Sequence, residues 1–392
     1  MNHARGTVAE SSAEDRKLYI AFELAEKKWK VRLGDGYQNP SEYTIPAGDT
    51  LSLTDKMDRV RRRLKLAQGC EVVSCYEAGR DGFWLHRWLE REGIHNVVVD
   101  PASIEVDRRQ RRAKTDGIDV KKLFERVVRY DRGQKEVWRV VVVPSAAEED
   151  ARRVHRELER LQKEATQHTN RIRSLLKLQG ITVGAIGGKK WEQTLEGLRI
   201  WDGSELPEKL QAELERETKR LEVVREQIRT VEGERRKAIA QAEEEGEARR
   251  GDPIDQVVKL MQLKGIGEKS AWLFVMEVFG WREFRNGKKV GGYSGLTGTP
   301  YASGESHRDQ GISKAGNRRL RRMAIEIAWA WVRFQPQSAL SQWFLRRYAD
   351  GGARRRRIGI VAVARQLLVA LWKYLEEGEI PEGAELKAGA SS

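Results

Sequence analysis

Four acidic residues in the first third of the chain have types and a spacing that could bind metal ions. Glu23 lies in the apolar segment YIAFEL and Glu77 ends a second one, VVSCYE; both segments are typical of strands. Asp116 and Asp119 lie three residues apart in KTDGIDVKKL, so they share one face at the start of an expected helix. Carboxylates are ligands of Mg²⁺, and two such ions stabilise the attacking and leaving oxygens of a phosphodiester. The four residues therefore predict a site for Mg²⁺ (or Mn²⁺).

This metal interpretation depends on the four acids acting together, because any one of them alone is more often a surface charge. Glu23 is the strongest single indication, since an acidic side chain between Phe22 and Leu24 in a strand costs free energy unless it has a partner. The sequence contains no CxxC pair, no HExxH motif and no GxxxxGK[ST] motif, so structural zinc and ATP are not expected.

A second candidate centre is Ser303, in the polar segment YASGESHRDQGISKAGNRRLRR. A serine hydroxyl is a weak nucleophile until a base or a metal activates it. His307 is close in sequence, but a single histidine in a polar loop more often faces solvent, so the acids above are better candidates for activation. Gly304 would allow the backbone to approach a nucleic-acid strand closely. By residue type alone, however, a serine at this place more often caps a turn.

Cationic segments could contact phosphates. The residues that follow the serine contribute Lys314, Asn317, Arg318 and Arg321. The sequence KGIG resembles the turn of a helix-hairpin-helix, in which backbone N–H groups approach a phosphate, although an ordinary helix connection fits it equally well. This turn contributes Lys264, Gly265 and Gly267. Arg354 and Arg355 open the last expected helix, where cations oppose the helix dipole and therefore favour a nearby anion.

The elements that must position these residues fall into three parts. Residues 17–145 contain three strands followed by alternating helices and strands, which predicts a mixed α/β sheet flanked by helices and matches the ribonuclease H-like fold. Residues 146–250 contain two long amphipathic helices, which favour an antiparallel coiled-coil arm over a solvated spacer. Residues 251–380 have the pattern of an all-α domain. Disorder is expected for residues 1–16 and 381–392.

Composition narrows the class of protein. The 392 residues contain 73 Lys and Arg against 59 Asp and Glu, and the net charge of +14 favours a polyanionic partner, nucleic acid rather than membrane. Cys70 and Cys75 are poorly placed for a disulfide, which fits a reducing cytoplasm. The N-terminal segment lacks the apolar core of a signal peptide, and no apolar run is expected to reach the length of a membrane span.

Together these motifs resemble the DEDD insertion-sequence transposases, the family that includes the Piv-type DNA invertases. That family has acids in an IxxD-like strand, an EAxG turn and a KTDxxDA segment; the corresponding segments here are AFEL, EAG and KTDGIDV, with Glu23 in place of the usual aspartate. The segment GLTGTPYASGESHRDQGISKAGNRRLRR is similar to the family's GLxPxxxxSG and ISKxGNxxLR, with Gly298 in place of the proline. The two matches span about residues 18–375.

The resemblance implies a RuvC-like domain with Mg²⁺ held by the four acids, a coiled-coil arm, and a helical C-terminal transposase domain. It implies that Ser303 is the nucleophile and forms a transient phosphoserine link to DNA. It also implies a guide non-coding RNA from the same element, a dimer or tetramer, and a bacterial or archaeal cytoplasmic protein associated with the nucleoid. Two alternatives remain open: a metal-dependent junction nuclease that uses the acids alone, and a non-catalytic nucleic-acid-binding scaffold.

Overall fold

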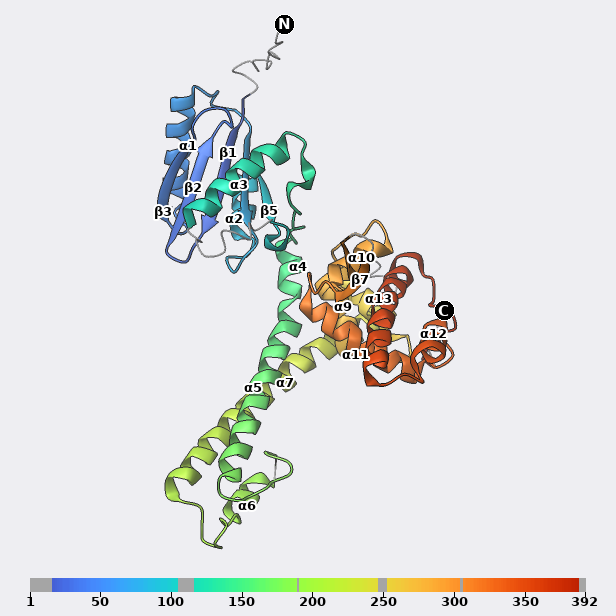
Figure 1. Ribbon diagram of the computed structural model, residues 1–392. Coiled ribbons are helices and arrows are strands. Elements are labelled where there is room, and N and C mark those ends of the chain that lie inside the picture. Colours follow the sequence, from blue (N-terminus) through green and yellow to red (C-terminus); the bar gives the residue numbers. More distant parts are fainter. Residues whose placement is uncertain (1–15, 105–115, 189, 246–251, 304–305, 388–392) are drawn as a thin grey trace. The chain divides into compact units, whose positions relative to one another are not determined.

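The computed structural model forms two compact units, Met1–Val143 and Pro144–Ser392 (Figure 1). It describes residues 16–104, 116–188, 190–245, 252–303 and 306–387, and it does not describe the side chains of residues 116–119 and 299–310. The expected arm and the expected C-terminal domain thus belong to one compact unit.

A five-stranded mixed sheet forms the centre of the first unit. Its spatial order is β3-β2-β1-β4-β5, and the strands are β1 Leu18–Leu24, β2 Lys28–Gly34, β3 Ser41–Pro46, β4 Val72–Glu77 and β5 His95–Val99. β2 is antiparallel to β1 and β3, whereas β4 is parallel to β1 and β5. The predicted mixed α/β sheet is therefore confirmed.

Helices cover both faces of this sheet. α1 (Thr50–Leu64) and α2 (Trp84–Arg91) pack on the face formed by the even-numbered residues of β1, and α3 (Asp116–Asp131) packs on the face formed by the odd-numbered ones. Successive side chains of a strand point to opposite faces, so covering both faces explains why YIAFEL is almost continuously apolar. Two short 3₁₀ turns complete the unit, Pro101–Ser103 and Lys135–Val137.

Two long helices of the second unit form an antiparallel hairpin. Its helices are α4 Ala146–Ala151, α5 Arg153–Lys177, α6 Trp191–Glu196 and α7 Glu208–Glu245. Leu158 of α5 packs with Val231 of α7 near one end, and Leu176 packs with Leu214 near the other. The expected pairing of the two helices is thus present, as Figure 1 shows.

The rest of the second unit is a helical domain with one large apolar core. Its helices are α8 Pro253–Met261, α9 Glu268–Phe274, the π-helical turn η6 Val275–Phe279, α10 Gly287–Ser294, α11 Arg318–Phe334, α12 Ala339–Tyr348 and α13 Ala353–Glu377. Two strands, β6 Gly298–Ser303 and β7 Ser306–Ile312, form an antiparallel hairpin between α10 and α11. The expectation of an all-α domain is wrong at this hairpin.

α13 is long and apolar enough, by length and composition, to cross a membrane. The expectation that no apolar run reaches this length is therefore wrong. Val363, Leu367 and Leu371 of α13 are nevertheless buried in the apolar core beside Trp331. This burial is typical of the central helix of a helical domain.

The chain stays ordered beyond residue 380, contrary to the expected disordered tail. Leu386 forms a β-bridge with Leu263, and the backbone N–H of Lys387 donates to the carbonyl oxygen of Gln262 at 2.7 Å. These long-range backbone hydrogen bonds fix residues 381–387 against the α8–α9 connection. The residues after 387 lie outside the described part of the chain.

Candidate active site

The strand register brings Glu23 and Glu77 to the same edge of the sheet. Phe22 of β1 is paired with Tyr76 of the parallel strand β4, and the two glutamates are the residues that follow this pair. Both lie at odd-numbered positions of their strands, on the face that α3 covers. Glu23 is half-buried and Glu77 is exposed, and Lys30 of β2 is directly opposite Glu23.

The direction of α3 places its first turn near this edge. Asp131, the last residue of α3, accepts a hydrogen bond from Tyr19 Oη at 2.8 Å and forms a 3.1 Å ion pair with Lys17, both at the start of β1. α3 therefore runs back along β1, from the end of the strand toward its beginning. Its 16 residues span ~24 Å and the seven residues of β1 span ~23 Å, so the two elements match in length.

A second contact fixes the level of α3 against β4. The carbonyl oxygen of Leu123 lies 3.7 Å from Cys75 Sγ. Asp119 lies one helical turn before Leu123, and Glu77 lies two residues after Cys75, so both lie farther toward the same edge. Burial raises the pKa of the Cys75 thiol, and the nearby charge of Glu77 raises it further, so Cys75 is an unreactive core residue.

The backbone thus brings the two glutamates and the first turn of α3 together. The side chains of Asp116 and Asp119 are outside the described set, and the described side chains alone contain no group of three or more metal-ligating residues. Four carboxylates from two parallel strand ends and one helix start are a donor set that suits Mg²⁺. The arrangement fits the predicted metal site.

Ser303 is the last residue of β6. It pairs with Ser306 of β7, and the residues between them, which include Gly304, lie outside the described part of the chain. His307 is paired with Ala302 in the same ladder. The serine therefore lies at the end of a strand, next to the turn of a hairpin, and not in the irregular loop that the polar sequence indicated.

The segment after β7 packs closely against the end of α10. The N–H groups of Lys314 and Asn317 donate to the carbonyl oxygens of Gly295, at 3.1 Å, and Tyr293, at 3.0 Å. Gly295 and Gly316 have φ values of +67° and +100°, and an added Cβ would overlap the carbonyl oxygens of Ala315 and Tyr293, respectively. This interlocking explains why glycines occupy both positions.

Gly316→Ala is expected to destabilise the second unit by about 2–4 kcal/mol, because it combines an unfavourable positive φ with a backbone clash. Gly292→Ala is a matched control: it lies in α10, where an added Cβ meets nothing within 4 Å, and should be neutral or stabilising by up to about 1 kcal/mol. Urea unfolding of the full chain measures both changes. Equal stability of the two variants would contradict the interlocking.

Two of the four predicted phosphate contacts near Ser303 form hydrogen bonds within the protein. Asn317 Oδ1 caps α11 by accepting from the N–H groups of Arg319 and Leu320, and Nδ2 donates to Glu277. Arg321 Nη1 donates to the carbonyl oxygen of Ser294 at 3.2 Å. The side chains of Asn317 and Arg321 therefore hold the segment after β7 in place.

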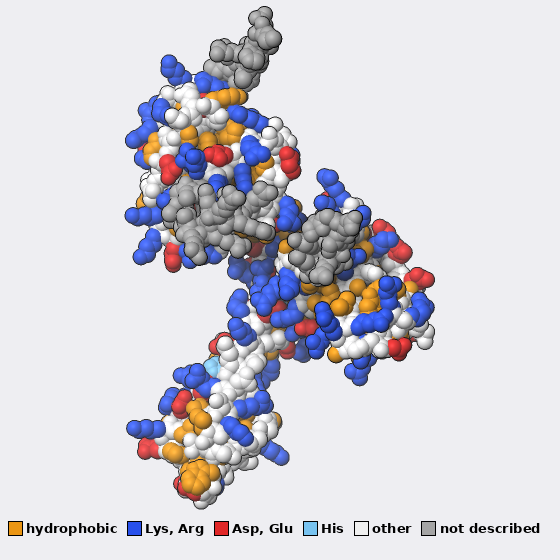
Figure 2. All heavy atoms as spheres, in the orientation of Figure 1, with side chains coloured by type: hydrophobic (Ala, Val, Ile, Leu, Met, Phe, Trp, Pro, Cys, Tyr) orange, Lys and Arg blue, Asp and Glu red, His pale blue; other side chains and the backbone are white. Residues whose placement is uncertain are grey.

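Lys314 and Arg318 differ from them in being exposed. Neither has an ion-pair partner among the residues that the structure describes. Both side chains are therefore available to a polyanion. Figure 2 shows other Lys and Arg side chains over both units, in keeping with the net charge of +14.

The KGIG turn does not offer the expected phosphate cradle. The side chain of Lys264 forms an ion pair with Glu385, and the backbone N–H of Lys264 donates to the carbonyl oxygen of Glu385. The N–H groups of Ile266 and Gly267 donate to Leu263 and to Ser270 Oγ. The backbone N–H groups of Lys264, Ile266 and Gly267 are thus engaged within the protein.

The arginines at the start of α13 are exposed, and one of them has a local partner. Arg355 Nη2 donates to the carbonyl oxygen of Arg347, in the last turn of α12, at 3.0 Å. A positive charge is unfavourable at the N-terminal end of a helix and favourable at the C-terminal end. The contact of Arg355 with the C-terminal end of α12 therefore offsets its unfavourable position at the start of α13. Arg354 has no such partner among the described residues, and it remains available to an anion.

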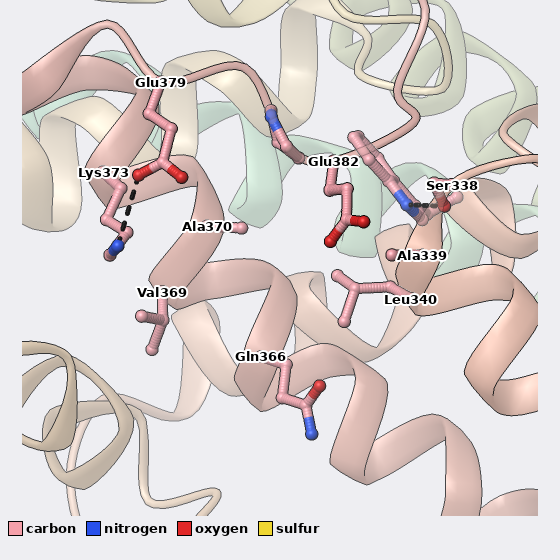
Figure 3. Close-up of a pocket in the computed structure, with 11 residues that line it drawn as sticks. Ser338, Ala339, Leu340, Gln366, Val369, Ala370, Lys373, Glu379 and Glu382 are labelled. Atoms are coloured by element: carbon pink, nitrogen blue, oxygen red, sulfur yellow. Dashed lines mark hydrogen bonds and ion pairs between the residues drawn. The ribbon is translucent and has the colours of Figure 1, made fainter.

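One cavity of the second unit, of about 260 Å³, lies between the helices and the tail (Figure 3). Trp331, Ala370 and Glu382 contribute to its lining, and the ion pair between Lys373 and Glu379, at 3.2 Å, lies at its edge. None of the candidate residues above lines it. The cavity is therefore separate from the candidate site residues.

Glu277 is a buried acid that was not predicted as a functional residue. Glu277, in η6, is 1% exposed and is hydrogen-bonded to His155 and Arg156 of the arm and to Asn317. Burial opposes its ionisation, but the hydrogen bonds from His155 and Arg156 outweigh burial and hold the pKa of Glu277 well below its ordinary value. The signal was available in LFVMEVF, where one acid interrupts an apolar run.

The chain is similar in sequence to known transposases. Residues 258–342, which include Ser303, match the family described as "Transposase IS116/IS110/IS902 family". "Putative transposase y4rJ" of Sinorhizobium fredii is 40% identical over 376 residues, which cover 94% of each chain. "Probable family 20 transposase" of Pseudomonas aeruginosa is 30% identical over 229 residues, 58% of this chain and 62% of the relative.

Proposed function

The chain belongs to the IS116/IS110/IS902 transposase family, and we propose that it cuts and rejoins DNA through a covalent phosphoserine at Ser303, aided by carboxylates that bind Mg²⁺ (or Mn²⁺). The observation that carries the metal-assisted part is the convergence of Glu23, Glu77 and the first turn of α3 at one edge of the sheet. The strand order β3-β2-β1-β4-β5 supports a ribonuclease H-like, RuvC-like first unit.

In this proposal Glu23, Glu77, Asp116 and Asp119 hold the cation. When bound, Mg²⁺ supplies positive charge that stabilises the charge developing on a phosphoryl group. Glu23 keeps the charge and ligand type of the aspartate that the resemblance leads us to expect, with a side chain one methylene longer. Lys30, directly opposite Glu23, adds positive charge on the same face of the sheet.

The reaction of the serine replaces one phosphate ester bond with another, so the number of such bonds does not change. Ser303 Oγ attacks a DNA phosphorus, an Oγ–P bond forms, and the bond from phosphorus to one sugar oxygen breaks. The serine proton leaves to a base, and the released sugar oxygen takes up a proton. Attack by a sugar hydroxyl of another strand reverses the step and frees the serine, so no ATP is needed. Lys314 and Arg318 are the candidates for contacts with the phosphates on either side.

The partners follow from the same proposal. DNA at the element ends and the target is the substrate, and an element-encoded non-coding RNA supplies the sequence information by base pairing, while the protein contacts backbone and shape. The net charge of +14 supports such polyanionic partners. A dimer or tetramer and a cytoplasmic location in association with the nucleoid complete the proposal, and they rest on the resemblance.

A recombination reaction with purified full-length protein tests this function. The reaction contains labelled DNA with the element junction and RNA transcribed from the element flanks. We expect cut and rejoined products with Mg²⁺ or Mn²⁺, and a loss of at least about 100-fold in EDTA, since a catalytic cation contributes several kcal/mol. Cut ends that are never rejoined would instead indicate a metal-dependent junction nuclease. Equal activity in EDTA would contradict the metal site.

A further inference from the structure

Glu277 collects hydrogen bonds from two separate parts of the second unit. It accepts from His155 Nε2 at 2.7 Å and from Arg156 Nε and Nη2 at 2.8 and 2.9 Å, all from α5. It also accepts from Asn317 Nδ2 at 3.1 Å. A buried carboxylate with four hydrogen-bond donors is held rigidly, because the loss of any donor would leave a buried charge without a compensating partner.

The backbone around Glu277 is unusual as well. η6 is a π-helical turn, in which the N–H of Gly280 donates to the carbonyl oxygen of Val275 at 2.9 Å. Such turns cost hydrogen-bond geometry and occur frequently at functional sites. Here the turn carries Glu277 to a place where it meets both α5 and the start of α11.

Asn317 is the link from this carboxylate to the serine hairpin. Its Oδ1 caps α11, and its N–H donates to Tyr293 at the end of α10. It is also the last residue of the short segment that begins directly after β7, the strand paired with the one that ends in Ser303. Asn317 thus joins Glu277, the end of α10 and the segment that leaves the hairpin.

We propose that Glu277 is a positioning residue: through Asn317 it holds the serine hairpin at a fixed place relative to the helical arm. The role of the hairpin as the carrier of the nucleophile rests on the proposed function, but the mechanical link does not. A second contact supports the attachment of the arm to the same helix start, since Glu159 of α5 forms ion pairs with Arg319 at 2.7 Å and Arg322 at 3.3 Å. These pairs are partly exposed and contribute less.

Asn317→Asp isolates the link. Aspartate caps helices as well as asparagine does, so α11 keeps its cap, but the donor to Glu277 becomes a second carboxylate that repels it. Combining Glu277→Gln with Asn317→Asp removes the repulsion between the two carboxylates, but the amide that faces Asp at position 317 can no longer accept from Arg156 Nη2. Hydrogen exchange of the full chain without DNA measures the hairpin through peptides that cover residues 298–312, with peptides of α13 as an internal reference.

We expect hairpin exchange about tenfold faster in Asn317→Asp, only partial recovery in the double variant, and unchanged α13 peptides. Glu283→Gln, an exposed acid six residues from Glu277, should change nothing. Unchanged hairpin exchange in Asn317→Asp would overturn the proposal, and so would equally accelerated α13 exchange, which indicates general destabilisation. If Asn317→Asp does not fold, Arg156→Lys tests the same link, because it keeps the charge and removes the paired donors.

The same variants separate this inference from the proposed function. Exchange is measured without substrate, so it holds or fails whatever the nucleophile is. If Ser303 is the nucleophile, Asn317→Asp should also slow covalent capture of bound DNA about tenfold, measured at saturating DNA. If Ser303→Ala leaves activity intact, the proposed function fails, and the exchange data alone decide the positioning role.

Discussion

Ser303→Ala is expected to abolish covalent capture of DNA and to lower strand exchange by at least about 10⁴-fold, because the substituted side chain has no oxygen to bond to phosphorus. The methyl group fits where the hydroxymethyl group was, so DNA binding should be retained. Denaturing gels that count protein–DNA adducts, alongside a binding titration, measure the two quantities separately.

Ser306→Ala is the matched control for this change. Ser306 faces Ser303 across the β6–β7 ladder, in the same hairpin and with the same side chain. It should retain adduct formation to within a few-fold. If Ser306→Ala abolished the adduct and Ser303→Ala did not, the nucleophile would be on β7, and our assignment would be wrong by one strand.

Glu23→Gln should lower metal-dependent strand cleavage by at least about 10³-fold, since the amide keeps the shape of the side chain and removes the charge that the cation requires. Glu23→Asp keeps that charge and should retain a substantial part of the activity. Cleavage rates over a Mg²⁺ titration compare the three proteins. A non-catalytic scaffold predicts no cleavage in any of them.

Glu26→Gln controls for the loss of one negative charge in this region. Glu26 is exposed in the β1–β2 turn and pairs only at the surface, with Arg80 at 3.5 Å. Its substitution should leave cleavage unchanged. Glu26→Gln as inactive as Glu23→Gln would indicate a general effect on charge or folding and would contradict a metal ligand at Glu23.

The fold of the first unit was predictable because short stretches of its sequence indicate each strand and helix. Apolar strands, polar turns and helical periodicity alternate along residues 17–131, and a mixed sheet follows from their order. The edge shared by Glu23 and Glu77 could also be expected, since parallel strands end at the same side of a sheet. The register, with Phe22 opposite Tyr76, came only from the structure.

The second unit was less predictable, for one local and one long-range reason. The strands GTPYAS and SHRDQGI lack an apolar alternation, so nothing in the residue types indicates a hairpin. The tail PEGAELK has the composition of a disordered end, yet Lys387 and Leu386 pair with residues more than 120 positions away. The roles of Asn317 and Arg321 also changed, because their partners come from other elements.

The most direct test of the account is to map the covalent adduct. Full-length protein is reacted with junction DNA, Mg²⁺ and element RNA, denatured, and digested with nuclease and trypsin. We expect a nucleotide mass on the peptide of residues 290–308, with fragment ions that assign it to Ser303 and not to Ser294 or Ser306. Cleaved DNA without any adduct, or an adduct on another residue, would contradict the phosphoserine mechanism.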